Sequence, residues 1–275
     1  MLQVLGKSAK VPLLARAARA DWRFVTRAWR ASRGVTGLTS LAEVLLMASK
    51  IFEFPSALPG VVVECGSFKG RSTAILSLAC RHAGRKLHVF DSFQGLPEPS
   101  GEDANHKVLS SNEVHRYKKG GLCGLLDEVR RNITEYGAID SCVFWPGFFN
   151  ETMPKFHEPV ALAFCDVDLV DSLRTCIEHI WPVLQDGGYF FTHEAHHLEI
   201  GRLFFDDVWW NQTLGCSAPG LIGAGSGLGI GLMPDGSYGS ALGYAVKNAS
   251  FTKVSEEDGV HNLGKADFAT RRGDA

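Results

Sequence analysis

Residues 61–73 read VVVECGSFKGRST, which combines the patterns of a buried strand, a glycine turn and a helix start. The opening valines are typical of a strand that is covered on both faces of a parallel sheet. Gly66 and Gly70 supply the backbone freedom that a tight turn needs. A turn of this kind presents backbone N–H groups at a helix start, which is a common site for a phosphate or nucleoside ligand.

A second apolar run, residues 87–90, ends in Asp91, about twenty-five residues after Gly66. Doubly wound folds place a carboxylate at this point, where it binds the ribose of a nucleoside. Gly66 and Gly70 are separated by three residues, so the GxGxxG pattern of dinucleotide-binding proteins is absent. The two patterns together predict a nucleoside cofactor and disfavour a dinucleotide.

Strand and helix patterns alternate along most of the chain, which predicts an α/β fold with a mostly parallel sheet. Residues 95–120 form a long polar connection of the kind that often covers a substrate. Residues 215–243 are rich in glycine and suit a loop with a terminal antiparallel hairpin formed by 230–233 and 243–246. The expected strands are 61–65, 87–91, 141–145, 160–166 and 188–192, and the expected helices are 38–53, 71–83, 121–136 and 171–184.

The 275 residues, 45% of them hydrophobic, suffice for one large domain with appendages. We expect a basic N-terminal arm (1–37), the main domain (38–250) and a polar C-terminal tail (251–275). The formal net charge of −2 gives no reason to expect a nucleic-acid partner. The arm concentrates arginines among apolar side chains, which suits a solvated arm, a contact in a homo-oligomer, or weak contact with an anionic membrane surface.

No run of apolar residues approaches the length of a transmembrane helix, and the N-terminal 33 residues lack the apolar core of a secretory signal. The seven cysteines include no CxxC pair, and Cys65 and Cys165 fall in expected buried strands. These features predict a soluble protein in a reducing, cytoplasmic setting.

Three further motifs occur in order: DSFQGLP at 91–97, PGFFNETMP at 146–154 and DVDLVDS at 166–172. With the 61–73 turn, they resemble the macrocin and mycinamicin O-methyltransferase group. The resemblance covers roughly residues 61–205. It implies a Rossmann-like class I methyltransferase fold, with a mostly parallel seven-stranded sheet, helices on both faces and a terminal antiparallel hairpin.

The resemblance also implies a reaction: methyl transfer from S-adenosylmethionine to a hydroxyl of a sugar or glycosylated small molecule. In that group the cofactor lies over the carboxyl ends of the first strands, as expected at a topological switch point. Asp168 would be the general base. The implied cofactor-binding residues are Glu64, Gly66, Ser67, Gly70, Ser72, Asp91, Ser92 and Asp166.

Asp166 and Asp168 follow one expected strand, and His193 and Glu194 follow the next. Because parallel strands bring their carboxyl ends to one edge of a sheet, these four side chains should cluster. The resemblance makes Asp166 a metal ligand, with His193 and Glu194 where the group usually has two aspartates. Carboxylates favour Mg²⁺, whereas the histidine shifts the preference toward Mn²⁺ or another transition metal. His193 is also a second candidate for the base.

Three other interpretations remain open. Residues 193–197, HEAHH, match the HExxH motif of zinc proteases, which requires a helix. Residues 223–228, GAGSGL, match a dinucleotide fingerprint but lack a preceding strand. Finally, a methyltransferase-like fold can serve as a binding or scaffold module without turnover.

Overall fold

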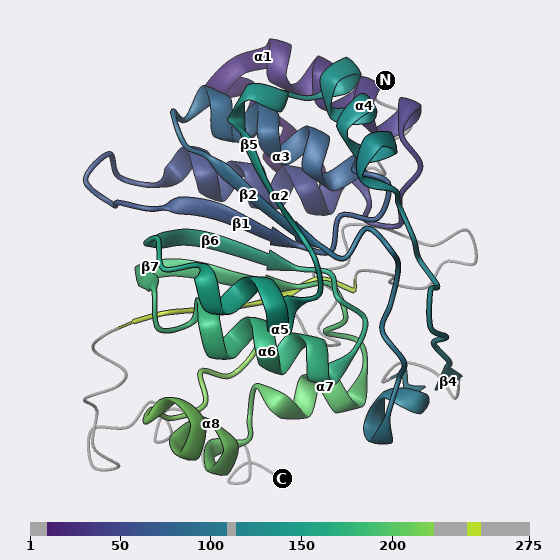
Figure 1. The fold of residues 1–275 in the computed structure, drawn as a ribbon. Helices are drawn as coiled ribbons and strands as arrows, with labels where there is room; N and C mark the ends of the chain where they lie inside the picture. Colours follow the sequence, from purple (N-terminus) through teal and green to yellow (C-terminus); the bar gives the residue numbers. More distant parts are fainter. Residues whose placement is uncertain (1–9, 109–113, 223–240, 249–275) are drawn as a thin grey trace, which may run out of the picture.

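The computed structural model describes residues 10–108, 114–222 and 241–248, and it contains one large mixed sheet in that part of the chain (Figure 1). The strand order is β5-β2-β1-β6-β7-β8, with β8 antiparallel to β7 and the other neighbours parallel. The mostly parallel α/β fold is therefore confirmed. The strands are β1 Val61–Cys65, β2 Leu87–Asp91, β5 Cys142–Pro146, β6 Val160–Cys165, β7 Leu184–Thr192 and β8 Gly243–Val246.

The expected seventh strand, at 230–233, lies outside the described residues, as does most of the glycine-rich segment. Its partner in the predicted hairpin, β8, is present where the sequence places it. Ile222 forms an isolated antiparallel bridge with Tyr244 of β8.

Helices cover both faces of the sheet (Figure 1). The helices α1, α2, α3 and α4 lie on one face, and α5, α6, α7 and α8 lie on the other. This arrangement follows from the alternation of strands with amphipathic helices. Their bounds are α1 Lys10–Gly34, α2 Leu41–Glu53, α3 Arg71–His82, α4 Leu126–Tyr136, α5 Phe149–Thr152, α6 Val170–Ile180, α7 Leu198–Leu203 and α8 Asp207–Leu214.

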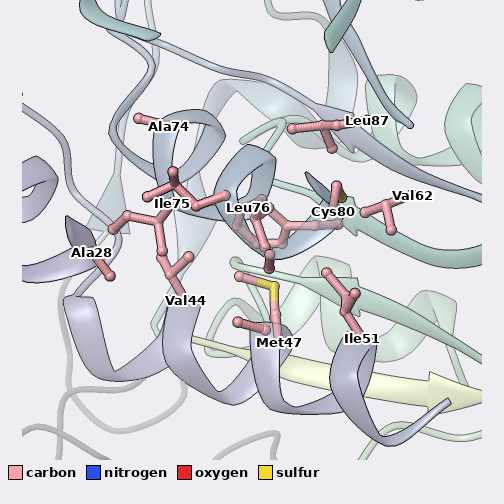
Figure 2. Close-up of a cluster of buried hydrophobic side chains, with 14 of the residues drawn as sticks. Ala28, Val44, Met47, Ile51, Val62, Ala74, Ile75, Leu76, Cys80 and Leu87 are labelled. Atoms are coloured by element: carbon pink, nitrogen blue, oxygen red, sulfur yellow. The ribbon is translucent and has the colours of Figure 1, made fainter. Parts of the chain in front are cut away.

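The core on the first face is formed where α2 and α3 meet the sheet (Figure 2). Met47 of α2 and Leu76 of α3 have no solvent exposure, and they share this cluster with Val62 of β1. A buried side chain of this size contributes about 1.5–3 kcal/mol to the free energy of unfolding. The packing therefore fixes α2, whose first turn reaches the candidate site described below.

The second half of α1 belongs to the same core. Phe24, Val25 and Ala28 are buried, and the Arg27 guanidinium donates to the Gly137 carbonyl oxygen at 2.9 Å. The predicted domain boundaries, at 37/38 and 250/251, stay predictions. The same holds for the contacts of the arm with a membrane surface or with a second copy of the chain. Within the described residues, no helix has both the length and the apolar character needed to cross a membrane.

Two connections differ from the sequence prediction. The helix expected from residue 121 begins at Leu126, because Gly120 and Leu122 adopt positive φ values of 73° and 53°. The 95–120 connection contains a 3₁₀ turn, Gly101–Ala104, and a short antiparallel pair, β3 His106–Lys107 and β4 Val114–His115. Polar composition alone did not indicate these elements.

Candidate active site

The candidate site lies at the carboxyl edge of β1 and β6, where the strand order reverses direction. Gly66 follows β1 with φ = 83°, and a Cβ atom at this position would collide with the Asp166 carbonyl oxygen. Only glycine fits this close approach. The turn then continues to Gly70, which caps the start of α3 with φ = 86°. The strand, glycine turn and helix predicted from 61–73 are all present.

The Asp91 carboxylate at the end of β2 is held by three donors. Its Oδ2 accepts hydrogen bonds from the Ser67 backbone N–H (2.7 Å) and hydroxyl (2.9 Å), and its Oδ1 accepts one from the Phe93 N–H (2.7 Å). Burial raises the pKa of Asp91, and these hydrogen bonds oppose that rise. A carboxylate offers about four lone-pair positions, so room for a further donor remains.

Three further predicted cofactor-binding residues, Glu64, Ser72 and Ser92, come from β1, the first turn of α3 and the loop after β2. The Glu64 carboxylate is fully buried, and neither oxygen has a hydrogen-bond partner among the described residues. Burial raises its pKa to about 8, although the nearby hydroxyls of Ser72 and Thr73 act in the opposite direction without reaching hydrogen-bond geometry. The Ser92 hydroxyl instead donates to the Gly95 carbonyl oxygen of its own loop at 2.7 Å.

Asp166, His193 and Glu194 converge at the ends of β6 and β7, with one potential ligand atom from each within 4.8 Å of the others. His193 Nδ1 lies 3.4 Å from Asp166 Oδ1, and its Nε2 lies 3.5 Å from Glu43 Oε2. Burial alone would lower the pKa of His193, but these two carboxylates hold it well above its ordinary value. Burial, with Asp166 and Asp168 nearby, raises the pKa of Glu194.

Asp168 lies just beyond β6 with a left-handed backbone, φ = 62°. Non-glycine residues rarely adopt this conformation, and it often marks a functional position. Burial and the neighbouring Asp166 charge raise its pKa to about 7, whereas the nearby Tyr117 hydroxyl acts to lower it. Asp168 is thus a half-buried carboxyl group whose pKa is raised toward neutrality.

Comparisons with known proteins agree with this fold. A model of the Macrocin-O-methyltransferase (TylF) family matches residues 5–213, about three quarters of the chain. The chain belongs to the macrocin O-methyltransferase family. The search of curated proteins found no match.

Two solved structures show the same fold as this macrocin O-methyltransferase family member. The O-methyltransferase NovP has 20% sequence identity and a TM-score of 0.58, over 77% of this chain and 83% of NovP. The calicheamicin methyltransferase CalS11 has 16% identity and a TM-score of 0.51, over 90% of this chain and 96% of CalS11. The Rossmann-like methyltransferase fold predicted from the motifs is therefore confirmed.

The sequence patterns did not identify three residues of this family member that reach the site: Thr39, Glu43 and Tyr117. The Thr39 hydroxyl donates to Asp166 Oδ2 at 3.0 Å, and Glu43 faces His193 from the first turn of α2. Ser40 and Glu43 form a capping box, whose S-x-x-E pattern is visible in the sequence and signals a helix start. No sequence signal indicates that this helix start, or Tyr117, lies beside the β6 edge.

The HExxH interpretation is wrong, because residues 193–197 lie between β7 and α7 and not in a helix. His193 faces Asp166, whereas His197 Nε2 lies 2.9 Å from His115 Nδ1, so the two histidines of the motif belong to different clusters. His197 is fully buried. The 223–228 fingerprint lies outside the described residues.

Proposed function

We propose that this chain transfers the methyl group of S-adenosylmethionine to a hydroxyl of a sugar or glycosylated small molecule. Family membership supports O-methyl transfer. The observation that carries the proposal is Asp168, a half-buried base candidate next to Asp166 at the switch point of the sheet, where Asp166, His193 and Glu194 converge. A carboxyl group with a raised pKa beside such a cluster is a candidate for catalysis, which favours an enzyme over a scaffold without turnover.

The turn after β1 fits the nucleoside cofactor. Asp91 retains capacity for a ribose hydroxyl, and Glu64 is a buried carboxyl group without a partner among the described residues, which a cofactor hydroxyl or amine would satisfy. When bound, S-adenosylmethionine supplies an electrophilic methyl group on a sulfonium. Ser67 fixes the Asp91 carboxylate, and Gly70 lets the backbone approach at the start of α3.

The acidic cluster fits a divalent cation. Asp166 and Asp168 are half-buried and Glu194 is buried, and the three carboxyl groups lie close enough to repel one another, which is costly unless a cation or protons neutralise them. Asp166, His193 and Glu194 would hold the ion, and the mixed oxygen and nitrogen donors suit Mn²⁺ as well as Mg²⁺. The ion would stabilise negative charge on the acceptor oxygen.

Asp168 performs the proton transfer in this proposal. A general base is most effective when its pKa lies near the working pH, and without the ion burial raises the pKa of Asp168 toward that range. Asp168 takes the proton of the acceptor hydroxyl as the oxygen attacks the methyl group. The Tyr117 hydroxyl, which lies close enough to Asp168 to affect its pKa, would orient the carboxylate by donating a hydrogen bond to it. His193 is the poorer base, because without the ion two carboxylates raise its pKa well above its ordinary value, and with the ion it would be neutral and engaged as a ligand.

Asp168→Asn tests this assignment because it keeps the shape of the side chain and removes the base. Turnover on a hydroxylated acceptor should fall by ~10²–10⁴ at pH 7, while calorimetry should show nearly unchanged affinity for S-adenosylhomocysteine. The exposed Asp140, next to the start of β5, offers a matched control, and Asp140→Asn should retain turnover. Turnover like the wild type in Asp168→Asn would transfer the role to His193.

A further inference from the structure

A second cluster of titratable side chains lies apart from the groups used in the proposed reaction. It brings together His106 of β3, His115 of β4, and His196 and His197 from the turn before α7. The ring centroids of His196 and His197 are 4.0 Å apart, and those of His115 and His197 are 4.9 Å apart. Two segments more than 80 residues apart in sequence therefore meet through imidazoles.

The hydrogen bonds of this cluster run in one direction. His106 Nε2 lies 3.1 Å from the buried Asp103 Oδ1, so the proton sits on Nε2 and leaves Nδ1 as an acceptor. His197 Nδ1, 3.3 Å away, must then donate to His106. In the neutral tautomer this leaves the Nε2 lone pair of His197 pointing toward His115 Nδ1, at 2.9 Å. Asp103 thus sets the tautomer of two histidines in succession.

His196 supplies a further nitrogen to the same place. Its Nδ1 is buried and has no hydrogen-bond partner among the described residues; the His193 backbone comes near without adequate geometry. One nitrogen each from His115, His196 and His197 lie within 4.8 Å of one another. Histidine binds metals in its neutral form, which is the form that the hydrogen bonds from Asp103 through His106 assign to His197.

We propose that His115, His196 and His197 form a binding site for a divalent transition metal of the zinc type, separate from the cation site proposed at Asp166. Imidazole ligands favour Zn²⁺, Cu²⁺ and Ni²⁺ over the oxygen-seeking Mg²⁺. Three protein ligands leave the fourth tetrahedral position for water.

The pair of His115 and His197 requires a small adjustment, and the His196 nitrogen lies within 4.8 Å of both. With Zn–N bonds of about 2.0–2.1 Å, tetrahedral ligand nitrogens lie roughly 3.3–3.4 Å apart. The present separation of His197 Nε2 and His115 Nδ1, 2.9 Å, must widen by about half an ångström. His115 must also carry its proton on Nε2, a change of tautomer that releases no proton. The ligating His197 keeps its Nδ1–H bond to His106, and so to Asp103, which is the outer support that metal-bound histidines usually have.

A metal here would join the 95–120 connection to the β7–α7 turn. Tyr117, two residues after His115, packs with its ring centroid 5.3 Å from that of His106 and 6.2 Å from that of His197. Its hydroxyl reaches Asp168 in the candidate active site. The site would therefore hold the segment that carries Tyr117, without itself touching the reacting groups.

Zinc binding to the full chain, without an affinity tag, tests the proposal. Protein freed of metal by a chelator is titrated with Zn²⁺ by competition calorimetry in excess Mg²⁺, which occupies oxygen-rich sites, and bound zinc is counted by elemental analysis. We expect one Zn²⁺ per chain, and a Co²⁺ form with the intense visible absorption of tetrahedral nitrogen coordination. Removing a ligand should weaken zinc binding by at least about a hundredfold in His115→Ala and in His196→Ala.

Two control variants distinguish this site from surface histidines and from the acidic cluster. His157→Ala removes an exposed histidine elsewhere and should leave the zinc affinity unchanged. Asp166→Asn alters the acidic cluster and should also retain the zinc. His115 lies in a short surface strand, so His115→Ala is expected to fold even if His196→Ala does not. The proposal would be overturned if the wild-type protein bound no zinc in the titration, or if His115→Ala and His157→Ala had equal zinc affinities. Loss of zinc binding in Asp166→Asn would also overturn it.

Discussion

The Asp91 side chain joins the end of β2 to the turn after β1. Its carboxylate accepts hydrogen bonds from two residues of the protein, Ser67 and Phe93, and these bonds fix its orientation before any cofactor binds. Preorganised acceptors of this kind lose little entropy on binding. The Asp91 carboxylate is therefore ready to receive ribose hydroxyls in the proposed complex.

Asp91→Ala should weaken S-adenosylhomocysteine binding roughly ten- to a hundredfold, since hydrogen bonds to a charged group contribute about 1.5–3 kcal/mol. Calorimetry measures the affinity directly. Asp140→Ala, at an exposed acidic residue next to β5, is the matched control and should bind like the wild type. Equal affinity in Asp91→Ala and the wild type would place the nucleoside elsewhere.

Glu64 is the least satisfied buried carboxyl group in the candidate cofactor turn, with a pKa raised to about 8 by burial. Since its pKa in the unfolded chain is near 4.5, the folded protein without ligand holds a proton that the unfolded chain releases over this interval. The stabilisation from this proton is complete below pH 4.5 and is lost as the pH rises through about 8.

Glu64→Gln should remove this part of the pH dependence. Between pH 6 and pH 9, the free energy of unfolding of the wild type without cofactor should fall relative to the variant, by about 2–3 kcal/mol. Urea unfolding at a series of pH values measures the difference. If the stabilities of the two proteins run parallel across this range, Glu64 is not a neutral buried acid.

The 95–120 connection couples two parts of the molecule through β3 and β4. Tyr117, just after β4, places its hydroxyl against Asp168, and burial together with the Asp168 and Glu194 charges raises the pKa of Tyr117. The hydroxyl is thus kept protonated as a donor. The β3–β4 pair, which precedes Tyr117 in the chain, forms a separate two-stranded sheet.

Tyr117→Phe should lower turnover about tenfold, because the Asp168 carboxylate loses one hydrogen bond that orients it. S-adenosylhomocysteine affinity should stay near the wild-type value. Steady-state kinetics and calorimetry separate the two effects. Tyr244 of β8 provides a control away from Asp168, and Tyr244→Phe should leave turnover unchanged. A Tyr117→Phe variant with full turnover would show that the hydroxyl is dispensable.

The parts of this site that follow from periodicity were predictable from the sequence. Asp166, His193 and Glu194 meet because they end neighbouring parallel strands, and a one-dimensional pattern is enough to locate strand ends. Thr39 and Tyr117 were not predictable, because each reaches the site through packing between elements distant in sequence. The α4 start was misplaced for a local reason: Leu122 adopts a left-handed conformation that no propensity indicates.

The whole molecule places these groups at one edge of one sheet. The strand order continues from β1 through β2 on one side and through β6 on the other, so the turn after β1, Asp91 and the acidic cluster after β6 lie at the same carboxyl edge of the sheet. The proposed nucleoside site and the proposed base therefore share this edge. Transfer of a methyl group to a neighbouring hydroxyl is the chemistry that this arrangement supports.

The most direct test is to determine which atom receives the methyl group. The full chain is incubated with S-adenosylmethionine labelled with ¹³C in its methyl group, Mg²⁺ or Mn²⁺, and a panel of sugars and glycosylated small molecules, and the product is analysed by NMR. We predict a labelled methyl on a sugar oxygen, no product in excess EDTA, and recovery when either metal is restored. Label on nitrogen or carbon, or no labelled product from any hydroxyl acceptor, would contradict the account.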